Sequence, residues 1–191
     1  MHRIIVLNPG STSTKVAVYD DTEKVFQTNI SHPTEELAKY EKIVDQLPYR
    51  KQVIEDILAE KGIDIASTDA YSAICTGLLT MPGGVFEVND VMYEHGKIGP
   101  GSKHPGNLGP LLAKDFADKY GRRAFVVDPS SLDEFIEEAR MTGFVELLRT
   151  PRGHPLNQRA VARQYASDHG CTWWSCIWVE ASPSALTSMA S

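Results

Sequence analysis

The run Asn8-Pro9-Gly10-Ser11-Thr12-Ser13-Thr14-Lys15 lies between two strand-like segments, Arg3-Ile4-Ile5-Val6-Leu7 and Val16-Ala17-Val18-Tyr19-Asp20. An apolar strand, a tight glycine-containing turn and a second strand predict a β-hairpin with Gly10 at its tip. The turn offers backbone N–H groups, hydroxyls, one amide and one ammonium, and such converging donors suit phosphate oxygens. The run therefore predicts a phosphate-binding hairpin. A polar turn without a ligand is the open alternative, because short Gly/Ser turns are common.

Two familiar phosphate-binding motifs do not fit this run. A P-loop has a second glycine directly before Lys-Ser/Thr and continues into a helix, whereas Thr14 precedes Lys15 and a strand follows. The dinucleotide-binding fingerprint needs three spaced glycines that open a helix, and only Gly10 is present.

The composition indicates a globular protein and argues against nucleic acid or an anionic membrane as its partner. The chain has 191 residues, 42% of them hydrophobic and 23% charged, which is typical of a soluble domain. Its net charge of −6 argues against nucleic acid or an anionic membrane as a partner. Because a strand pattern begins at the very start, we expect no signal peptide. Because no long apolar run occurs, we expect no membrane span. Three cysteines without paired spacing fit a reducing cytoplasm.

The rest of the chain alternates between strand and helix patterns, which predicts an α/β fold with a mixed sheet. A third strand completes an N-terminal β-meander, and a helical region follows, which Pro48 should break or kink. The expected strands are 25–30, 70–74, 85–88 and 123–128, and the expected helices are 33–62, 107–120, 132–140 and 156–169.

Several further segments, taken with the hairpin, resemble one family. They are Ile30-Ser31-His32-Pro33-Thr34-Glu35-Glu36-Leu37, Pro82-Gly83-Gly84, Asn107-Leu108-Gly109, Val127-Asp128-Pro129 and Leu156-Asn157-Gln158-Arg159-Ala160-Val161-Ala162-Arg163. In this order, over residues 1 to about 170, they resemble butyrate kinases, of the acetate/butyrate kinase group in the actin-like ATPase superfamily. The resemblance implies an actin/hexokinase-like (ribonuclease H-like) lobe with a mixed sheet and flanking helices.

The resemblance also implies a reaction, in which ATP and a short-chain carboxylate such as butyrate give ADP and an acyl phosphate with the help of Mg²⁺. In phosphoryl transfer, positioning and charge neutralisation supply most of the catalysis. Asn8 and Asp128 would act on the metal through water, and His154 would hydrogen-bond the transferring phosphoryl group. His104 corresponds to a histidine near the substrate pocket. The resemblance implies phosphate contacts for Gly10, Ser11, Thr12, Ser13 and Lys15, and an intact family member is a homo-oligomer.

Structural interpretations stand beside these roles. Asp128-Pro129 is also a good strand-terminating turn, and His154 between Gly153 and Pro155 also fits a plain loop. The remaining histidines show no ligand spacing and are expected at the surface or at helix caps: His2, His32, His95 and His169.

The chain departs from the family at two places. Where the family usually carries Gly-Arg-Gly-Gly, this chain has Ile74-Cys75-Thr76-Gly77-Leu78-Leu79 and no arginine. After Gly170 the composition changes abruptly, and all three tryptophans fall there. Residues 173–191 can be written with synonymous codons that, read in another reading frame, encode a peptide matching the family's next strand and second phosphate hairpin. We therefore expect a frameshift near Thr172, followed by early termination.

The expected organisation is a first actin-like lobe over residues 1–150, an entry helix of the second lobe over 151–170 and an aberrant tail over 171–191. Most of the second lobe would be missing, so kinase activity is expected to be impaired. The alternative is an inactive fragment with at most weak phosphate or nucleotide binding. We expect a loosely placed tail whose tryptophans are exposed, which quenching of tryptophan fluorescence would test.

Overall fold

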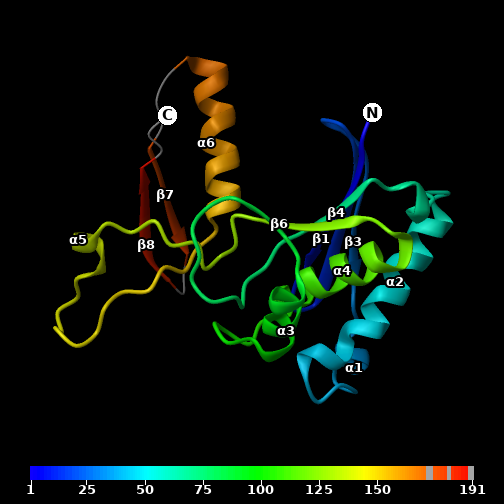
Figure 1. The fold of residues 1–191 in the computed structure, drawn as a ribbon, viewed down its shortest axis with the longest axis horizontal. Coiled ribbons are helices and arrows are strands. Elements are labelled where there is room, and N and C mark those ends of the chain that lie inside the picture. Colours follow the sequence, from blue (N-terminus) through cyan, green and yellow to red (C-terminus); the bar gives the residue numbers. More distant parts are fainter. Residues whose placement is uncertain (171–173, 180–181, 189–191) are drawn as a thin grey trace. The chain divides into compact units, whose positions relative to one another are not determined.

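The computed structural model describes residues 1–170, 174–179 and 182–188 (Figure 1). It divides into two units, the first formed by residues 1–79 and 84–127 and the second by residues 80–83 and 128–191. The first unit contains strands β1 (Arg3–Pro9), β2 (Ser13–Asp20), β3 (Glu23–Ser31), β4 (Ala70–Ala73), β5 (Val85–Glu87) and β6 (Arg123–Val127). Its helices are α1 (Thr34–Leu37), α2 (Leu47–Glu60), α3 (Asp90–Ile98) and α4 (Leu108–Tyr120), with short 3₁₀ turns at Ile43–Gln46, Ile65–Ser67 and Pro105–Asn107.

The six strands of the first unit form one mixed sheet in the order β3-β2-β1-β4-β6-β5. Strands β1, β2 and β3 are antiparallel neighbours, which confirms the predicted meander. Strands β1, β4 and β6 run parallel, and β5 closes the far edge antiparallel to β6. The predicted α/β fold with a mixed sheet is therefore confirmed.

The core of the first unit lies between one face of this sheet and the helices α2 and α4 (Figure 1). Side chains alternate along a strand, and in β1 and β2 the alternate residues Ile5, Leu7, Val16 and Val18 are buried. The helices contribute buried residues at helical spacing, among them Ile54, Leu58, Leu111, Leu112 and Phe116.

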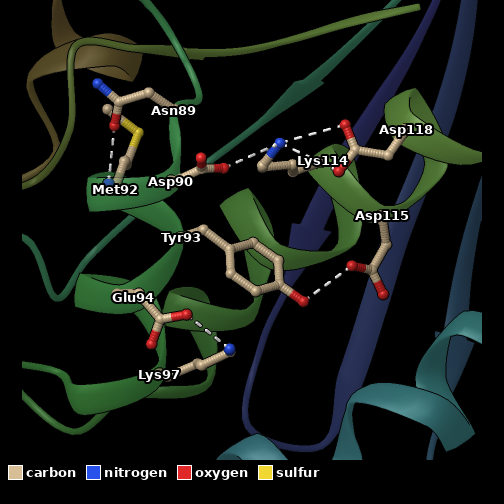
Figure 2. A network of polar contacts seen from close by, with 9 residues as sticks. All are labelled: Asn89, Asp90, Met92, Tyr93, Glu94, Lys97, Lys114, Asp115 and Asp118. Carbon is tan, nitrogen blue, oxygen red and sulfur yellow. Dashed lines mark hydrogen bonds and ion pairs between the residues drawn. The ribbon is translucent and has the colours of Figure 1, made fainter. Parts of the chain in front are cut away.

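Helix α3 was not predicted, although its start carries a recognisable cap. Asn89 accepts a hydrogen bond from the Met92 N–H at 2.9 Å. Figure 2 shows how α3 is joined to α4 by polar side chains. Tyr93 donates to Asp115 at 2.9 Å, while the Lys114 ammonium lies 3.4 Å from Asp90 and 3.0 Å from Asp118. Burial, followed by the Asp115 carboxylate, raises the pKa of Tyr93 to about 12, so this phenol stays a donor at neutral pH.

The helix prediction was wrong at two places in detail. The expected helical region 33–62 is divided into α1, the 3₁₀ turn at Ile43–Gln46 and α2, but the interruption falls at residues 38–42. Pro48 itself lies in the first turn of α2, where a proline is tolerated. The predicted helix 132–140 is reduced to α5 (Glu137–Arg140). The residues just before α5 form a turn instead of a helix. The Asp133 carboxylate accepts a hydrogen bond from the Phe135 N–H at 3.2 Å and forms an ion pair with Arg140 at 2.9 Å.

The second unit holds α5, α6 (Pro155–His169) and the antiparallel strands β7 (Trp174–Val179) and β8 (Ser182–Ser188). The tail therefore includes a hairpin that its residue pattern did not predict. The predictions about the placement of the tail and the exposure of its tryptophans concern positions and side chains outside the described residues. Among the described residues, no helix has both the length and the apolar character needed to cross a membrane.

Candidate phosphate-binding site

The predicted hairpin is present at the junction of β1 and β2. Pro9 pairs with Thr14 in the ladder, so the loop between the strands is Gly10–Thr12. The Gly10 N–H donates to the Ser13 carbonyl at 2.7 Å and closes the turn. This confirms the predicted shape, with Gly10 in the loop between two antiparallel strands.

The two faces of the hairpin differ in character. Asn8 stands directly opposite Lys15 in the ladder, so their side chains share one face of the sheet. Thr14 lies on the other face and is fully buried toward the core. Within the described residues, the Asn8 amide and the Lys15 ammonium have no hydrogen-bond or ion-pair partner. Both groups are therefore available to a ligand on their face of the sheet.

The carbonyl oxygens of Ser11, Thr12 and Ser13 are bound by two buried residues, Arg50 and His32. Arg50 donates to the carbonyls of Ser11 and Ser13, each at 3.3 Å. The His32 N–H donates to the Thr12 carbonyl at 2.8 Å. In the described part of the chain the N–H groups of Ser11 and Thr12 have no acceptor, and both residues are exposed. A turn with bound carbonyls and unused N–H groups is a ready anion-binding surface.

Arg50 was missed by sequence reasoning and is the most informative residue of the site. It lies in the first turns of α2, fully buried, and its guanidinium also donates to Gln46 Oε1 at 3.0 Å and Thr14 Oγ1 at 3.0 Å. Burial lowers the pKa of the guanidinium from its ordinary value, yet arginine remains charged in proteins. Its position four residues before Ile54 and eight before Leu58 places it on the apolar face of the helix, which was the available signal.

His32 corrects a prediction, because it is not a surface residue. Only 4% of it is exposed, and its ring nitrogens lie 2.8 Å from Thr14 Oγ1 and 3.2 Å from Tyr49 Oη. Burial, with a smaller contribution from the Arg50 charge, lowers its pKa from 6.5 to about 4. The histidine is therefore neutral at pH 7 and serves the hairpin as a buried hydrogen-bonding group.

The burial of His32 predicts a pH-dependent stability. The folded-state pKa is lower than the unfolded one, so the unfolded chain takes up a proton first as the pH falls below 6.5. We expect the contribution of His32 to be complete above that pH and to fall by about 2 kcal/mol between pH 7.5 and pH 5. Urea unfolding at both pH values measures it. In His32→Asn the pH dependence should be smaller by this amount, and an unchanged dependence would contradict the assignment.

His104 is held in the first unit by its own neighbours. Its Nδ1 accepts the Gly106 N–H at 3.0 Å and lies 3.2 Å from Thr76 Oγ1, and Thr76 also donates to Asn107 Oδ1 at 2.9 Å. The structure thus places His104 beside Thr76. Thr76 belongs to the segment 74–79, in which the resemblance implies an arginine that this chain lacks. The neighbouring Cys75 is buried, which raises the pKa of its thiol to about 11 and makes it a poor nucleophile at neutral pH.

Asp128 and His154 belong to the second unit. Asp128 directly follows β6 and has a left-handed backbone conformation with φ of 40°. Its carboxylate accepts a hydrogen bond from Arg159 Nη1 at 2.9 Å. Arg159, which also pairs with Glu134, is a second residue that sequence reasoning did not single out. A Cβ on Gly83 would lie 2.5 Å from Arg159 Nη1, so this glycine leaves room for the ion pair. His154 is exposed at the start of α6, and its carbonyl accepts the Gln158 N–H at 3.1 Å.

The sheet order and the hairpin define the class of fold. The structure resembles the acetate kinase of Porphyromonas gingivalis with a TM-score of 0.60 at 13% identity, over 89% of this chain and 49% of that one. It resembles the acetate kinase of Entamoeba histolytica with a TM-score of 0.57 at 13% identity, over 87% and 46% of the two chains. The first unit thus has the fold of the N-terminal domain of acetate kinase, an actin-like ATPase fold.

Sequence comparison narrows this class, although no family model matches the chain. The chain is homologous to butyrate kinases. It is 41% identical to a probable butyrate kinase of Clostridium botulinum (strain Eklund 17B) over 169 residues, 88% of this chain and 48% of that protein. It is 39% identical to butyrate kinase 1 of Clostridium acetobutylicum over 170 residues, 89% of this chain and 48% of that one. The chain therefore spans about half the length of the curated relatives it matches.

Proposed function

We propose that this chain supplies the first phosphate-binding hairpin of an ATP-dependent kinase for short-chain carboxylates, with butyrate as acceptor. In this reaction a carboxylate oxygen forms a bond to the γ-phosphorus of ATP while the bond to the ADP oxygen breaks, which gives an acyl phosphate. The homology to butyrate kinases carries the proposal, and the unused donors of the Gly10–Thr12 loop support it.

Each hairpin donor has a role in this proposal. The N–H groups of Ser11 and Thr12 and the hydroxyls of residues 11–13 bind phosphate oxygens, while Lys15 neutralises their charge. Asn8, on the same face as Lys15, holds a water of the metal-bound phosphate. In the second unit, Asp128 orients a metal-bound water or the carboxylate, and His154 donates to the transferring phosphoryl group.

The donor set fits a magnesium ion carried by the nucleotide. Among the described residues no group of three or more His, Cys, Asp and Glu side chains is arranged to hold a metal. Mg²⁺ keeps several waters and is usually bound through one or two protein groups and substrate phosphates. Asn8 of the first unit and Asp128 of the second would each act on the ion through water, and the ion would supply positive charge that neutralises the phosphates.

A titration calorimetry experiment with MgATP tests the proposal. We expect saturable binding by the 191-residue polypeptide and a loss of at least about tenfold in affinity for Lys15→Met, because a charged hydrogen bond to phosphate is lost. Lys24→Met, on exposed β3, removes the same charge away from the turn and should leave the affinity within about twofold. The second candidate, a fragment without nucleotide binding, predicts no heat of binding for any of the three proteins.

A further inference from the structure

The charge of Arg50 has no counter-charge within the described residues. Its guanidinium is fully buried, and every partner it contacts is neutral: the carbonyls of Ser11 and Ser13, Thr14 Oγ1 and Gln46 Oε1. Buried charges in proteins are almost always paired with an opposite charge, because an isolated buried ion is costly. An arginine that only supported the hairpin could be replaced by a neutral donor without this cost. The missing anion therefore points to a ligand.

The geometry of a peptide unit shows how Arg50 can act through the turn. In a trans peptide the C=O and the following N–H point in opposite directions. Since Arg50 holds the Ser11 carbonyl on the inner side at 3.3 Å, the Thr12 N–H of the same peptide unit points outward. The bond to a cation also polarises this peptide unit and strengthens its N–H as a donor.

A second contact fixes the same loop from β3. The His32 N–H holds the Thr12 carbonyl at 2.8 Å, and its ring contacts the same Thr14 hydroxyl that accepts from Arg50. Three consecutive carbonyls of the turn are thus bound, those of Ser11 and Ser13 by Arg50 and that of Thr12 by the His32 N–H. The N–H groups of Ser11 and Thr12 keep no acceptor within the described residues.

We propose that Arg50 is a positioning residue for phosphate, a buried cation that turns and polarises the peptide between Ser11 and Thr12 and finds its counter-charge in the bound phosphate. This inference rests on the proposed function and goes beyond it, because it assigns a role to a residue that cannot touch the ligand. It also gives the hairpin a fixed positive charge in a chain that lacks the arginine expected near Thr76.

Two variants of Arg50 test the inference, with inorganic pyrophosphate as the probe in titration calorimetry. Arg50→Gln keeps a donor and removes the charge, so we expect its affinity to fall at least about tenfold. Arg50→Lys keeps the charge but loses the planar guanidinium that donates to several acceptors at once, so we expect its affinity for pyrophosphate to fall about threefold. Arg149→Gln, which removes the charge of an exposed side chain, is the matched control and should change the affinity by less than about twofold.

The amide spectrum without ligand gives a readout that does not depend on binding. In both Arg50 variants the Thr12 amide resonance should move upfield, and in Arg149→Gln it should not. If Arg50→Gln does not fold, Arg50→Lys serves as the test. The inference would be overturned if Arg50→Lys bound pyrophosphate with the affinity of the unaltered chain and its Thr12 resonance did not move. Pyrophosphate binding by Arg50→Gln as tight as by the unaltered chain would overturn it alone. Failure of the unaltered chain to bind would overturn the proposed function and this inference with it.

Discussion

In a hydroxamate assay with ATP and butyrate, the isolated 191-residue polypeptide is expected to form acyl phosphate at least ~10³-fold more slowly than butyrate kinase 1 of Clostridium acetobutylicum. The polypeptide spans 48% of that relative. Phosphoryl transfer depends on groups that surround the phosphates and neutralise their charge, and removal of a single such donor commonly costs about 10²- to 10³-fold in rate. The absence of an arginine from the segment 74–79, where the family resemblance implies one, would add to this loss.

The full-length relative, assayed in parallel, controls for the reagents and the coupling reaction. Turnover by the polypeptide within about tenfold of the relative, abolished by Asn8→Ala, would contradict the expectation. Such a result would show that these residues hold a complete site. A rate near background together with retained MgATP binding would match both expectations, that the hairpin binds the nucleotide and that the polypeptide forms acyl phosphate slowly.

Gly109→Ala is expected to lower the free energy of unfolding by about 3 kcal/mol, near the upper end of the range for overpacked sites. Gly109 is the second residue of α4, at the point where this helix meets the end of β4. A Cβ there would lie 2.0 Å from the carbonyl oxygen of Ile74 and 3.3 Å from Ala73 Cβ. Backbone cannot move aside as a flexible side chain can, so helix and strand must separate.

Urea unfolding measures this effect, and Gly143→Ala is the matched control. An added Cβ at Gly143 meets nothing within 4 Å, so this exposed position should change stability by less than about 0.5 kcal/mol. If Gly109→Ala were as stable as Gly143→Ala, the close approach of α4 to β4 would be wrong.

The hairpin and the meander could be predicted because their signals are local. Alternating apolar residues, a glycine turn and a second alternating segment specify a hairpin within about twenty residues. Helix α4 was equally clear, since its apolar stripe ends at Gly121, which has the left-handed conformation typical of a helix end.

The parts that sequence reasoning missed depend on contacts between distant residues. Arg50 reaches carbonyls 37 and 39 positions earlier in the chain, and Arg159 meets Asp128 across 31 positions. Periodicity can place Arg50 on a buried helix face, but it cannot say which turn lies opposite. His32 was misplaced for the same reason.

The helix prediction at residues 132–140 failed because apolar spacing alone is ambiguous. Leu132 forms a bridge with Met81 instead of a helical contact. The Asp133 side chain competes for the nearby backbone N–H, as short acidic side chains commonly do outside helices.

The central claim is that the loop Gly10–Thr12 binds phosphate through the N–H groups of Ser11 and Thr12, while Arg50 holds the Ser11 carbonyl on the buried side of the turn. A titration of ¹⁵N-labelled polypeptide with MgATP, followed residue by residue in the amide spectrum, tests it most directly. The account predicts that the Ser11 and Thr12 amides shift progressively and saturate together, with a midpoint equal to the calorimetric one. Binding heat without movement of these two amides, or movement confined to other parts of the chain, would contradict it.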